Sequence, residues 1–588
     1  MDPTTNNLGI FLFPTAICTR NPPPEEQPSP ESIWSDSYLN PKNRINSLSK
    51  FKKQRWTIDG SSPIGTRLYA FPDFARGGPP LCIDTYIPNI NQEPGYLREV
   101  LRPNSSIFLE NGQVECSSIA QHILQALEAW SEHWGWEEFE EAYLNMPFGS
   151  RILIKNIHID PRKMTIDLVP YYAVEQQMLS VDALQALWEL AQGAWPEVLD
   201  IKELHFVKKL HETISLVQIS GEDSQIYVFK SLTDDLKPFY HELKTLLTLS
   251  YHPNIISRPS HIITKKCGFG GKTGVCGFVL EYHAHGTLRT VLNERSIHHA
   301  LTFQDQLRWA IQITSAILHI HETTSGDIFY TTMKPENVVM AITPSNPTIL
   351  DAVIIDFEQR LGPPCWNPPE INYIDYITTL AKKASLVSMK QKYVSLLESA
   401  NLLWPENESK TSTTTKYKNP RYGYSHPWPT LPVKQREAAQ VFGLGKLLWC
   451  IFENGTLLNT AIGIHTFREG VSDLEFPEFR RSPERLRELI RKCTMGDGEW
   501  RERGLPLVRR GVKIGVRGGE GDETEEDVRV ACRKWWREEV ADAEKFVAAR
   551  AMRNMEDADV WNWTFERPAL REVLDELESL IGTQGYDG

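Results

Sequence analysis

Residues Tyr330–Met340 have the sequence YTTMKPENVVM, which contains a strong signal for the class of fold. A second stretch, Ile354–Glu358, follows it and has the sequence IIDFE. Phosphoryl transfer requires a lysine on the phosphates, ligands for a metal ion, a group that positions the nucleophile and a loop that covers the nucleotide. The two stretches contain residue types that suit these tasks. Asp356 in particular offers the carboxylate oxygen that a hard cation prefers.

Three pieces upstream add to this set. Ile226–Lys230 (IYVFK) is an alternating strand that ends in a lysine. Glu242 lies in a helix-like run and is the natural ion-pair partner of that lysine, and His252–Ile256 (HPNII) follows the run. Each piece alone is a weak signal, but their order is specific. Together with the run K-P-E-N-V-V, they resemble the protein kinase superfamily over roughly the last two-thirds of the chain.

The resemblance implies an α+β, bilobal protein-kinase-like fold with a small β-rich lobe and a large helical lobe. It also implies ATP as the nucleotide. Lys230 and Glu242 would lie at its phosphates. Gly277–Tyr282 resembles the hinge, with Leu280 at the gatekeeper position and Glu281 beside it as a further nucleotide contact.

The metal and the phosphate contacts follow from the same resemblance. Asn337 and Asp356 match the ligands of Mg²⁺, and Lys334 matches the contact to the γ-phosphate. Pro368-Pro369-Glu370 resembles A-P-E, and Glu370 is expected to pair with Arg567 in the R-P that precedes the last helix.

The helical part carries further signs of the resemblance. Val441–Glu453 is similar to the buried central helix of the large lobe, and Gln440 takes the place of a structural aspartate. The sequence around Asp356–Arg360 and the pair Trp535-Trp536 also resemble a group of fungal kinase-like proteins.

The departures from the kinase pattern affect residues that catalysis needs. Thr332 replaces the catalytic aspartate, and a threonine cannot accept a proton from a substrate hydroxyl near neutral pH. Losing such a base costs about 10²–10⁴-fold in rate. Thr331 replaces the arginine that would hold a phosphorylated loop, and residues 357–369 contain no Ser, Thr or Tyr. Leu210–Val217, where the glycine-rich loop belongs, has no glycine, and Glu358 adds a negative charge next to the metal ligand.

Two ways of keeping part of the activity remain open. Asp327, slightly upstream of Tyr330, would substitute for the missing aspartate if the loop folds back. Alternatively, the kinase-type residues that remain would bind nucleotide without turnover. The plainest interpretation is that Lys230 and Glu242 form a structural ion pair and that the site is empty.

Three parts follow one another along the chain. Residues 1–50 read as a flexible arm, because they are rich in Pro, Ser, Asn and charge. Residues 51–196 read as an α+β module of unknown function, with an amphipathic helix from Ile119 to Trp134 and a hairpin made of Arg151–Ile159 and Met164–Val169. The kinase-like region takes up residues 202–582.

Two insertions in the kinase-like region are candidate surfaces for protein partners. Residues 371–435 contain a helix-like stretch and a polar segment, and residues 496–527 are rich in Gly, Arg and Glu. Both are expected to be loops, and long loops in a compact domain are usually functional or disordered. A long helix is expected at about 525–552.

Composition excludes several classes of function. The net charge of −13 disfavours a nucleic-acid partner or an anionic membrane surface. The nine cysteines form no C-x-x-C pair, which fits a reducing compartment. The longest apolar stretch, Val441–Phe452, is too short to span a bilayer. We therefore expect an intracellular protein, cytoplasmic or nuclear.

These observations favour a pseudokinase, a kinase-fold scaffold or allosteric partner in which ATP and Mg²⁺ bind weakly or not at all. The alternative is an active, atypical Ser/Thr-type kinase that transfers the γ-phosphoryl group of ATP. A third hypothesis is an interaction protein that no longer binds nucleotide.

Overall fold

A computed structural model describes residues 55–582 except for a set of gaps. The gaps are 62–66, 88–105, 109–113, 117–118, 157–160, 191–194, 223, 233–234, 269, 332, 344, 361, 363–364, 385, 403–416, 456–457, 459–475, 501–503, 505, 511–512, 520–522 and 554–565. The expected N-terminal arm, Thr332 and most of the polar segment of the first insertion lie outside the described residues. The described part is a mixed α+β structure, as expected.

A five-stranded sheet comes first along the chain. Its order is β1 (Trp56–Ser61), β2 (Arg67–Pro72), β3 (Asp84–Tyr86), β6 (Arg151–Ile154) and β7 (Ile166–Val169). Strands β6 and β7 pair antiparallel, which confirms the predicted hairpin, and β3 pairs parallel to β6. The predicted amphipathic helix is α4 (Ile119–Trp134), and it shares an apolar core with the sheet and with α5 (Trp136–Leu144). A two-stranded sheet, β4 (Ser106–Phe108) and β5 (Val114–Cys116), lies between β3 and α4 in the sequence.

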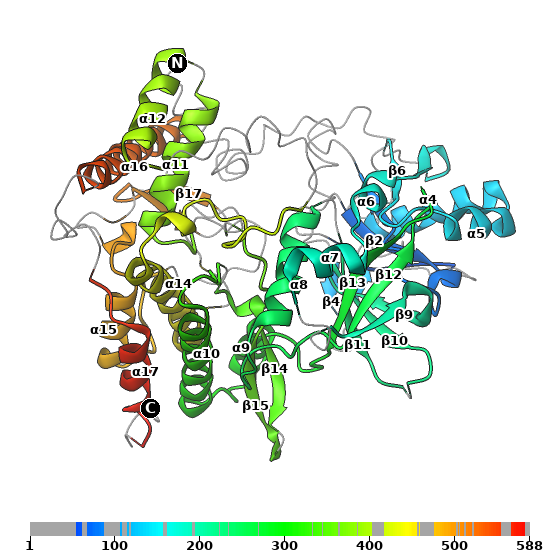
Figure 1. The fold of residues 1–588 in the computed structure, drawn as a ribbon, viewed down its shortest axis with the longest axis horizontal. Helices are drawn as coiled ribbons and strands as arrows, with labels where there is room; N and C mark the ends of the chain where they lie inside the picture. Colours follow the sequence, from blue (N-terminus) through cyan, green and yellow to red (C-terminus); the bar gives the residue numbers. More distant parts are fainter. Residues whose placement is uncertain are drawn as a thin grey trace.

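A six-stranded sheet follows along the chain (Figure 1). Its order is β8 (Glu197–Asp200), β12 (His261–Lys266), β13 (Thr273–Glu281), β11 (Tyr227–Ser231), β10 (Ile214–Ile219) and β9 (Leu204–Lys209). All neighbours pair antiparallel except β8, which adds to the edge parallel to β12. Helix α8 (Leu236–Thr248) follows β11, while α6 (Tyr172–Gln177) and α7 (Val181–Trp188) precede the sheet in the sequence.

A helical region comes next. It contains α9 (Leu288–Ile297), α10 (Phe303–Thr324), the hairpin β14 (Val338–Thr343) and β15 (Asn346–Ile354), α14 (Val433–Glu453), α15 (Glu484–Cys493) and α17 (Leu570–Glu578). Helix α14 is buried along nearly all of its second half, which confirms the expectation of a buried central helix. Its apolar residues share one core with α10, α17 and the six-stranded sheet.

The two insertions meet in a separate apolar core. Helices α11 (Pro369–Lys383) and α12 (Val387–Ser399) from the first insertion pack against α16 (Glu525–Arg553), the predicted long helix (Figure 1). The expectation of loops at 371–435 and 496–527 is wrong in part. The first segment contains α12 and nearly all of α11, and the second contains the hairpin β16 (Leu507–Arg510) and β17 (Lys513–Val516). The hairpin forms because Leu507 and Val516 are opposite each other and pack into this core.

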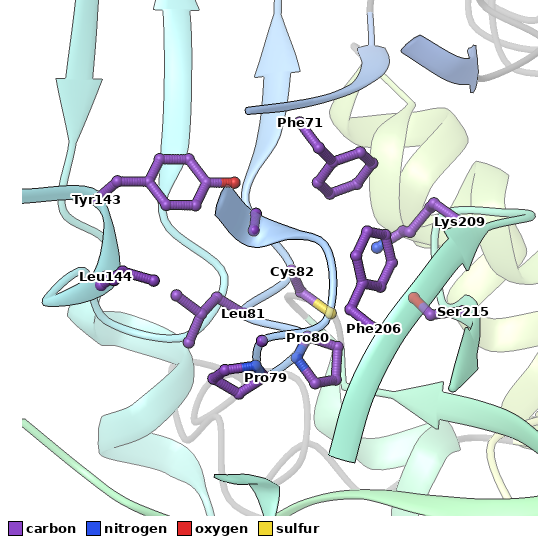
Figure 2. A pocket seen from close by; sticks show the side chains of 12 residues that line it. Phe71, Pro79, Pro80, Leu81, Cys82, Tyr143, Leu144, Phe206, Lys209 and Ser215 are labelled. Carbon is purple, nitrogen blue, oxygen red and sulfur yellow. The ribbon is translucent and has the colours of Figure 1, made fainter. Parts of the chain in front are cut away.

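The five-stranded sheet and the six-stranded sheet are joined at β9. Phe206 of β9 exchanges backbone hydrogen bonds of 2.8 and 2.9 Å with Gly77 and Gly78, and its ring lies 4.7 Å from that of Phe71. A cavity with room for about one water molecule lies at this junction. Figure 2 shows Lys209 and Ser215 extending into it from β9 and β10.

Candidate functional site

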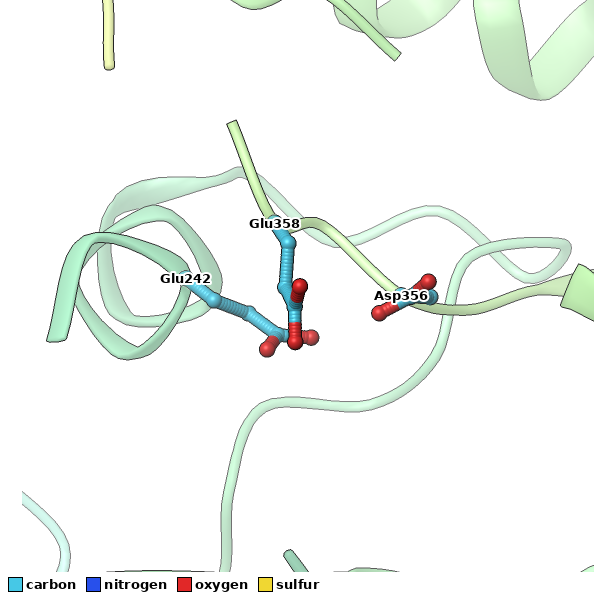
Figure 3. A group of neighbouring side chains, drawn as sticks. All are labelled: Glu242, Asp356 and Glu358. Carbon is cyan, nitrogen blue, oxygen red and sulfur yellow. The ribbon is translucent and has the colours of Figure 1, made fainter. Parts of the chain in front are cut away.

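The Lys230 side chain lies among three carboxylates. Its Nζ is 2.6 Å from Glu242 Oε2, 2.9 Å from Asp356 Oδ1 and 3.4 Å from Glu358 Oε1. Lys230 is 5% exposed and Glu242 is 1% exposed, so this pair is buried. Figure 3 shows the three carboxylates converging from α8 and from the segment that follows β15. The predicted ion pair of Lys230 and Glu242 is confirmed.

Helix α8 and the segment after β15 are joined through Glu242. Asp235 caps the start of α8, because its carboxylate accepts a hydrogen bond from the Lys237 backbone N–H. Glu242 Oε1 accepts a hydrogen bond of 3.1 Å from the Phe357 backbone N–H. Asp356 has φ of +70°, a left-handed conformation that is uncommon for a non-glycine residue. Such outliers persist only where the surroundings hold them, as the contacts of Asp356 with Lys230 do here.

Asn337 lies on the other side of Asp356. Its Nδ2 donates a hydrogen bond of 3.1 Å to Asp356 Oδ2. The two residues that the sequence assigns to the metal are therefore adjacent, although their role as ligands stays a prediction. Lys334 lies in the same loop, half-buried, and its positive charge helps to lower the pKa of Asp356.

Tyr330 fixes the two segments that carry these residues, and sequence reasoning missed this role. Its hydroxyl is 2.5 Å from the Ile355 carbonyl oxygen and 3.1 Å from that of Asn337. Burial, and then the charge of Asp356, raises the pKa of Tyr330 well above its usual value, so the phenol stays protonated and can donate. Its ring lies 5.3 Å from that of buried Phe357. The only sequence signal was an aromatic residue directly before Thr331.

The charges of the cluster are coupled. Burial raises the pKa of Glu242 to about 8, although Lys230 opposes the shift. Burial alone would lower the pKa of Lys230, but Asp356 and the other carboxylates outweigh it and raise that pKa well above its usual value. Burial would likewise raise the pKa of Asp356, and Lys230 outweighs it, so the pKa falls below its usual value. Glu242, Asp356 and Glu358 place ligand oxygens within 4.8 Å of one another, a geometry that favours a cation.

The turn at His211 takes the place expected for the glycine-rich loop. It joins β9 to β10 and carries His211 and Glu212. Desolvation, and then the positive charge of Lys334, lowers the pKa of His211 to about 4, although more than a third of the residue's surface is exposed. Arg67 of β2 pairs with Glu212, so the five-stranded sheet contacts this turn directly.

The hinge-like residues lie on β13. Leu280 is opposite Val228 and Glu281 is opposite Tyr227 in the β11–β13 register. Side chains of residues two apart, and of residues directly opposite, share a face of a sheet. Leu280 therefore lies on the face that carries Lys230. Glu281 is exposed and accepts a hydrogen bond of 3.5 Å from Ser257, and its contact with a nucleotide stays a prediction.

Asp327 pairs with arginines. Its Oδ2 is 3.0 Å from Arg421 Nε, its Oδ1 is 3.4 Å from Arg436 Nη1, and its backbone oxygen accepts a hydrogen bond from Trp428. Among the described residues, no contact joins Asp327 to the Lys230 cluster. Its proposed role as a substitute for the missing aspartate stays a prediction.

Glu370 and Arg567 form another buried ion pair of the region. Nη1 of Arg567 is 2.5 Å from Glu370 Oε1, and Nη2 is 3.2 Å from Oε2, which makes the pair bidentate. This predicted pair is confirmed.

Gln440 donates a hydrogen bond of 3.1 Å to the Ile328 carbonyl oxygen, so it supports the backbone that leads into Tyr330–Met340.

Comparison with curated proteins finds two partial relatives among receptor kinases of Arabidopsis thaliana. The chain is 27% identical over 150 residues to wall-associated receptor kinase-like 5, covering 23% of this chain and 19% of that protein. It is 26% identical over 160 residues to wall-associated receptor kinase-like 1, covering 24% and 20%. The chain thus spans about a fifth of the length of these relatives. No family model matches the chain.

The comparisons support a kinase-like relationship. They concern plant proteins and give no support to the fungal part of the resemblance. No helix among the described residues is long and apolar enough to cross a lipid bilayer.

Proposed function

We propose that this protein is a bilobal pseudokinase, a kinase-like scaffold or allosteric partner that does not transfer phosphoryl groups efficiently. The observation that carries the proposal is the sharing of one buried ammonium, Lys230, among three carboxylates. A lysine engaged in this way neutralises protein carboxylates rather than phosphate oxygens. The partial likeness to receptor kinases supports the kinase-like class.

The donor set fits a divalent cation better than it fits nucleotide phosphates. Asp356, with its lowered pKa, is ionised at neutral pH, and Asn337 is adjacent to it. These two residues would hold Mg²⁺, which would neutralise the charge of bound phosphate. Glu358 works against phosphate, because one of its carboxylate oxygens lies 3.4 Å from Lys230 Nζ while the other is held 2.7 Å from Arg360 Nε. The glycine-free turn at His211 also places side chains where phosphates need close backbone approach.

The alternative is an atypical active Ser/Thr-type kinase, and one observation favours it. Lys230 is paired with Glu242 and Asp356 is hydrogen-bonded to Asn337, so the described nucleotide-side residues are in an assembled arrangement. Against it stands Thr332, since a threonine hydroxyl cannot take the proton of a substrate hydroxyl near neutral pH. That loss costs about 10²–10⁴-fold in rate.

Thermal unfolding with Mg²⁺ alone, ATP alone and Mg²⁺ plus ATP tests the nucleotide question. A ligand at a hundred times its Kd stabilises by about 2.7 kcal/mol. We expect a shift with Mg²⁺, a small additional shift with ATP, and a larger ATP shift in Glu358→Gly. A large ATP shift in the natural chain that Glu358→Gly leaves unchanged would contradict the role given to Glu358.

Transfer of radiolabelled phosphate from ATP tests the pseudokinase proposal itself. Asp356→Ala removes the metal-side carboxylate, and Asp327→Ala removes the candidate substitute base. We expect transfer at the background level in the natural chain. Robust transfer that Asp356→Ala abolishes would overturn the pseudokinase proposal, and additional loss in Asp327→Ala would assign the base.

A further inference from the structure

Residues 417–424, which we call the strap, return from the first insertion and contact both elements that form the Lys230 cluster. We propose that the strap holds α8 in the position at which Glu242 reaches Lys230. The insertion would then fix the ion pair within the chain, in place of a phosphorylated loop. This inference does not depend on whether nucleotide binds.

The strap contacts α8 on the turns that flank Glu242. Asn419 Oδ1 accepts a hydrogen bond of 2.7 Å from Lys244 Nζ. The Tyr417 hydroxyl is 3.5 Å from His241 Nδ1, and the Tyr424 ring stands edge-on to the same imidazole at 6.0 Å. His241 is 4% exposed, so the strap encloses this side of the helix.

The strap also joins α8 to α7. Asn419 Nδ2 donates a hydrogen bond of 2.7 Å to the Leu187 carbonyl oxygen at the end of α7. The indole N–H of Trp188 donates one of 3.1 Å to the Tyr417 hydroxyl. The side chain of Asn419 therefore uses its oxygen on α8 and its amide on α7. A single carboxamide at this position connects the two helices.

At its other end the strap contacts the segment that follows Asp356. The Tyr424 backbone N–H donates a hydrogen bond of 2.5 Å to the Gln359 carbonyl oxygen. Gly423 has φ of +71°, and a Cβ there would overlap Gln359 Cβ and lie 2.6 Å from Gln359 O. Only glycine permits this approach, because both the conformation and the space exclude a side chain.

The strap and Glu242 thus join the same two segments. Glu242 connects α8 to Phe357, while the strap connects His241, the neighbour of Glu242, to Gln359, two residues beyond Phe357. In protein kinases the corresponding helix must be in place for the lysine–glutamate pair to form, and loop phosphorylation controls it. Residues 357–369 offer no hydroxyl to phosphorylate. The strap supplies a contact that needs no modification.

Amide hydrogen exchange of the full chain tests the strap with Gly423→Ala. The matched control is Gly221→Ala. Gly221 has φ of +86°, and a Cβ added to it would meet nothing within 4 Å, so this variant reproduces the backbone strain without the clash. We expect exchange in α8 and in residues 355–359 to rise about tenfold or more in Gly423→Ala. In Gly221→Ala it should stay at the natural rate in both segments.

A second pair of variants keeps the test sound if Gly423→Ala does not fold. Asn419→Ala removes both hydrogen bonds to α7 and α8. Its matched control is Asn401→Ala, because both asparagines have φ of +53° and no side-chain contact of the exposed Asn401 is described. We expect a rise of about fivefold in α8 for Asn419→Ala only. Faster exchange in the strap with natural exchange in α8 would overturn the proposal, as would no change in the strap itself.

Discussion

Two buried ion-pair sites of the kinase-like region, at Arg567 and at Lys230, balance charge in different ways. Arg567 pairs with the carboxylate of Glu370 through two parallel contacts. Lys230 meets three carboxylates, of which Glu358 is the one that the kinase pattern does not predict. Three carboxylates contact the ammonium of Lys230, and Glu358 also pairs with Arg360, whose Nε lies 2.7 Å from its Oε2. The Glu370–Arg567 pair is a single bidentate contact, whereas the Lys230–Glu242 pair is extended by contacts of Lys230 with Asp356 and Glu358.

Breaking the Glu370–Arg567 pair should have the largest effect on the free energy of unfolding. Arg567→Met leaves Glu370 buried without its cation, and such a loss typically costs about 3–5 kcal/mol. The side chains of Arg567 and Glu370 are only 1% and 9% exposed, so solvent cannot compensate. Urea unfolding should show the loss as a lower midpoint. An effect below about 1 kcal/mol would mean that the pair does not hold the fold.

A pH effect of intermediate size is expected beside the Lys230 cluster, at His241. Burial, and then the charge of Lys244, lowers the pKa of His241 from 6.5 to about 4. The folded state therefore binds this proton less readily than the unfolded state. The contribution of the neutral imidazole to stability is fully present above pH 6.5 and is lost as the pH falls towards 4. Relative to His241→Gln, the natural chain should lose about 1–3 kcal/mol across this window.

The measurement for His241 is the difference in unfolding free energy between the two chains at several pH values. Taking this difference removes the contribution of the carboxylates that both chains contain, because they titrate in both. A difference that stays constant between about pH 7 and about pH 4.5 would show that His241 titrates normally in the folded state.

Removing the charge of Glu358 from the Lys230 cluster should have a smaller effect on the free energy of unfolding. Glu358→Gln removes one of the three negative charges, and Glu358 is among the groups that raise the pKa of Glu242 to about 8. We expect a gain of about 1 kcal/mol at about pH 9, shrinking towards about pH 6 as Glu242 takes up its proton. Glu336→Gln is the control, because Glu336 pairs with Arg289 at 3.0 Å outside the cluster. It should lose stability at both pH values.

The smallest effect is expected four residues beyond Arg567. Arg571 pairs with Glu322 at 3.0 Å, but the two side chains are 57% and 55% exposed. Arg571→Ala should cost less than about 1 kcal/mol and should cost nothing in high salt, because exposed pairs are screened. Urea unfolding at two salt concentrations checks this. A loss of stability in Arg571→Ala as large as that in Arg567→Met would show that burial does not explain why the Arg567 pair matters more.

Much of the site could be predicted because its parts lie in short, ordered motifs. Alternation identified the strand that ends in Lys230, and helical spacing placed Glu242 on the helix that follows. The run from Lys334 to Asn337 and the stretch around Asp356 marked the two segments that the structure brings together. The paired Glu370 and Arg567 were also foreseen. In each case the local pattern and the tertiary contact agree.

The strap and the role of Tyr330 could not be predicted from the same signals. Residues 417–424 have neither helical nor strand periodicity, because their positions are set by separate contacts to α7, α8 and Gln359. The hydroxyl of Tyr330 bridges two carbonyl oxygens that only the folded chain brings together. The hairpin of β16 and β17 was missed because the glycines and charged residues around it are typical of a loop. The strap, the role of Tyr330 and the packing of the hairpin all depend on contacts between segments that are distant in the sequence.

The pair Glu370–Arg567 has a further consequence for the history of the chain. The two residues are 197 positions apart, and the chain between them includes α12, the strap, α14, α15 and α16. Closing a longer loop costs little, because the entropy grows with the logarithm of length, by about 0.6 kcal/mol for each doubling. The helices of the insertions have an apolar core of their own. Because α11, α12 and α16 pack in this separate core, a change in the length or outer surface of these three helices leaves the core around α14, which lies in the same interval, in place.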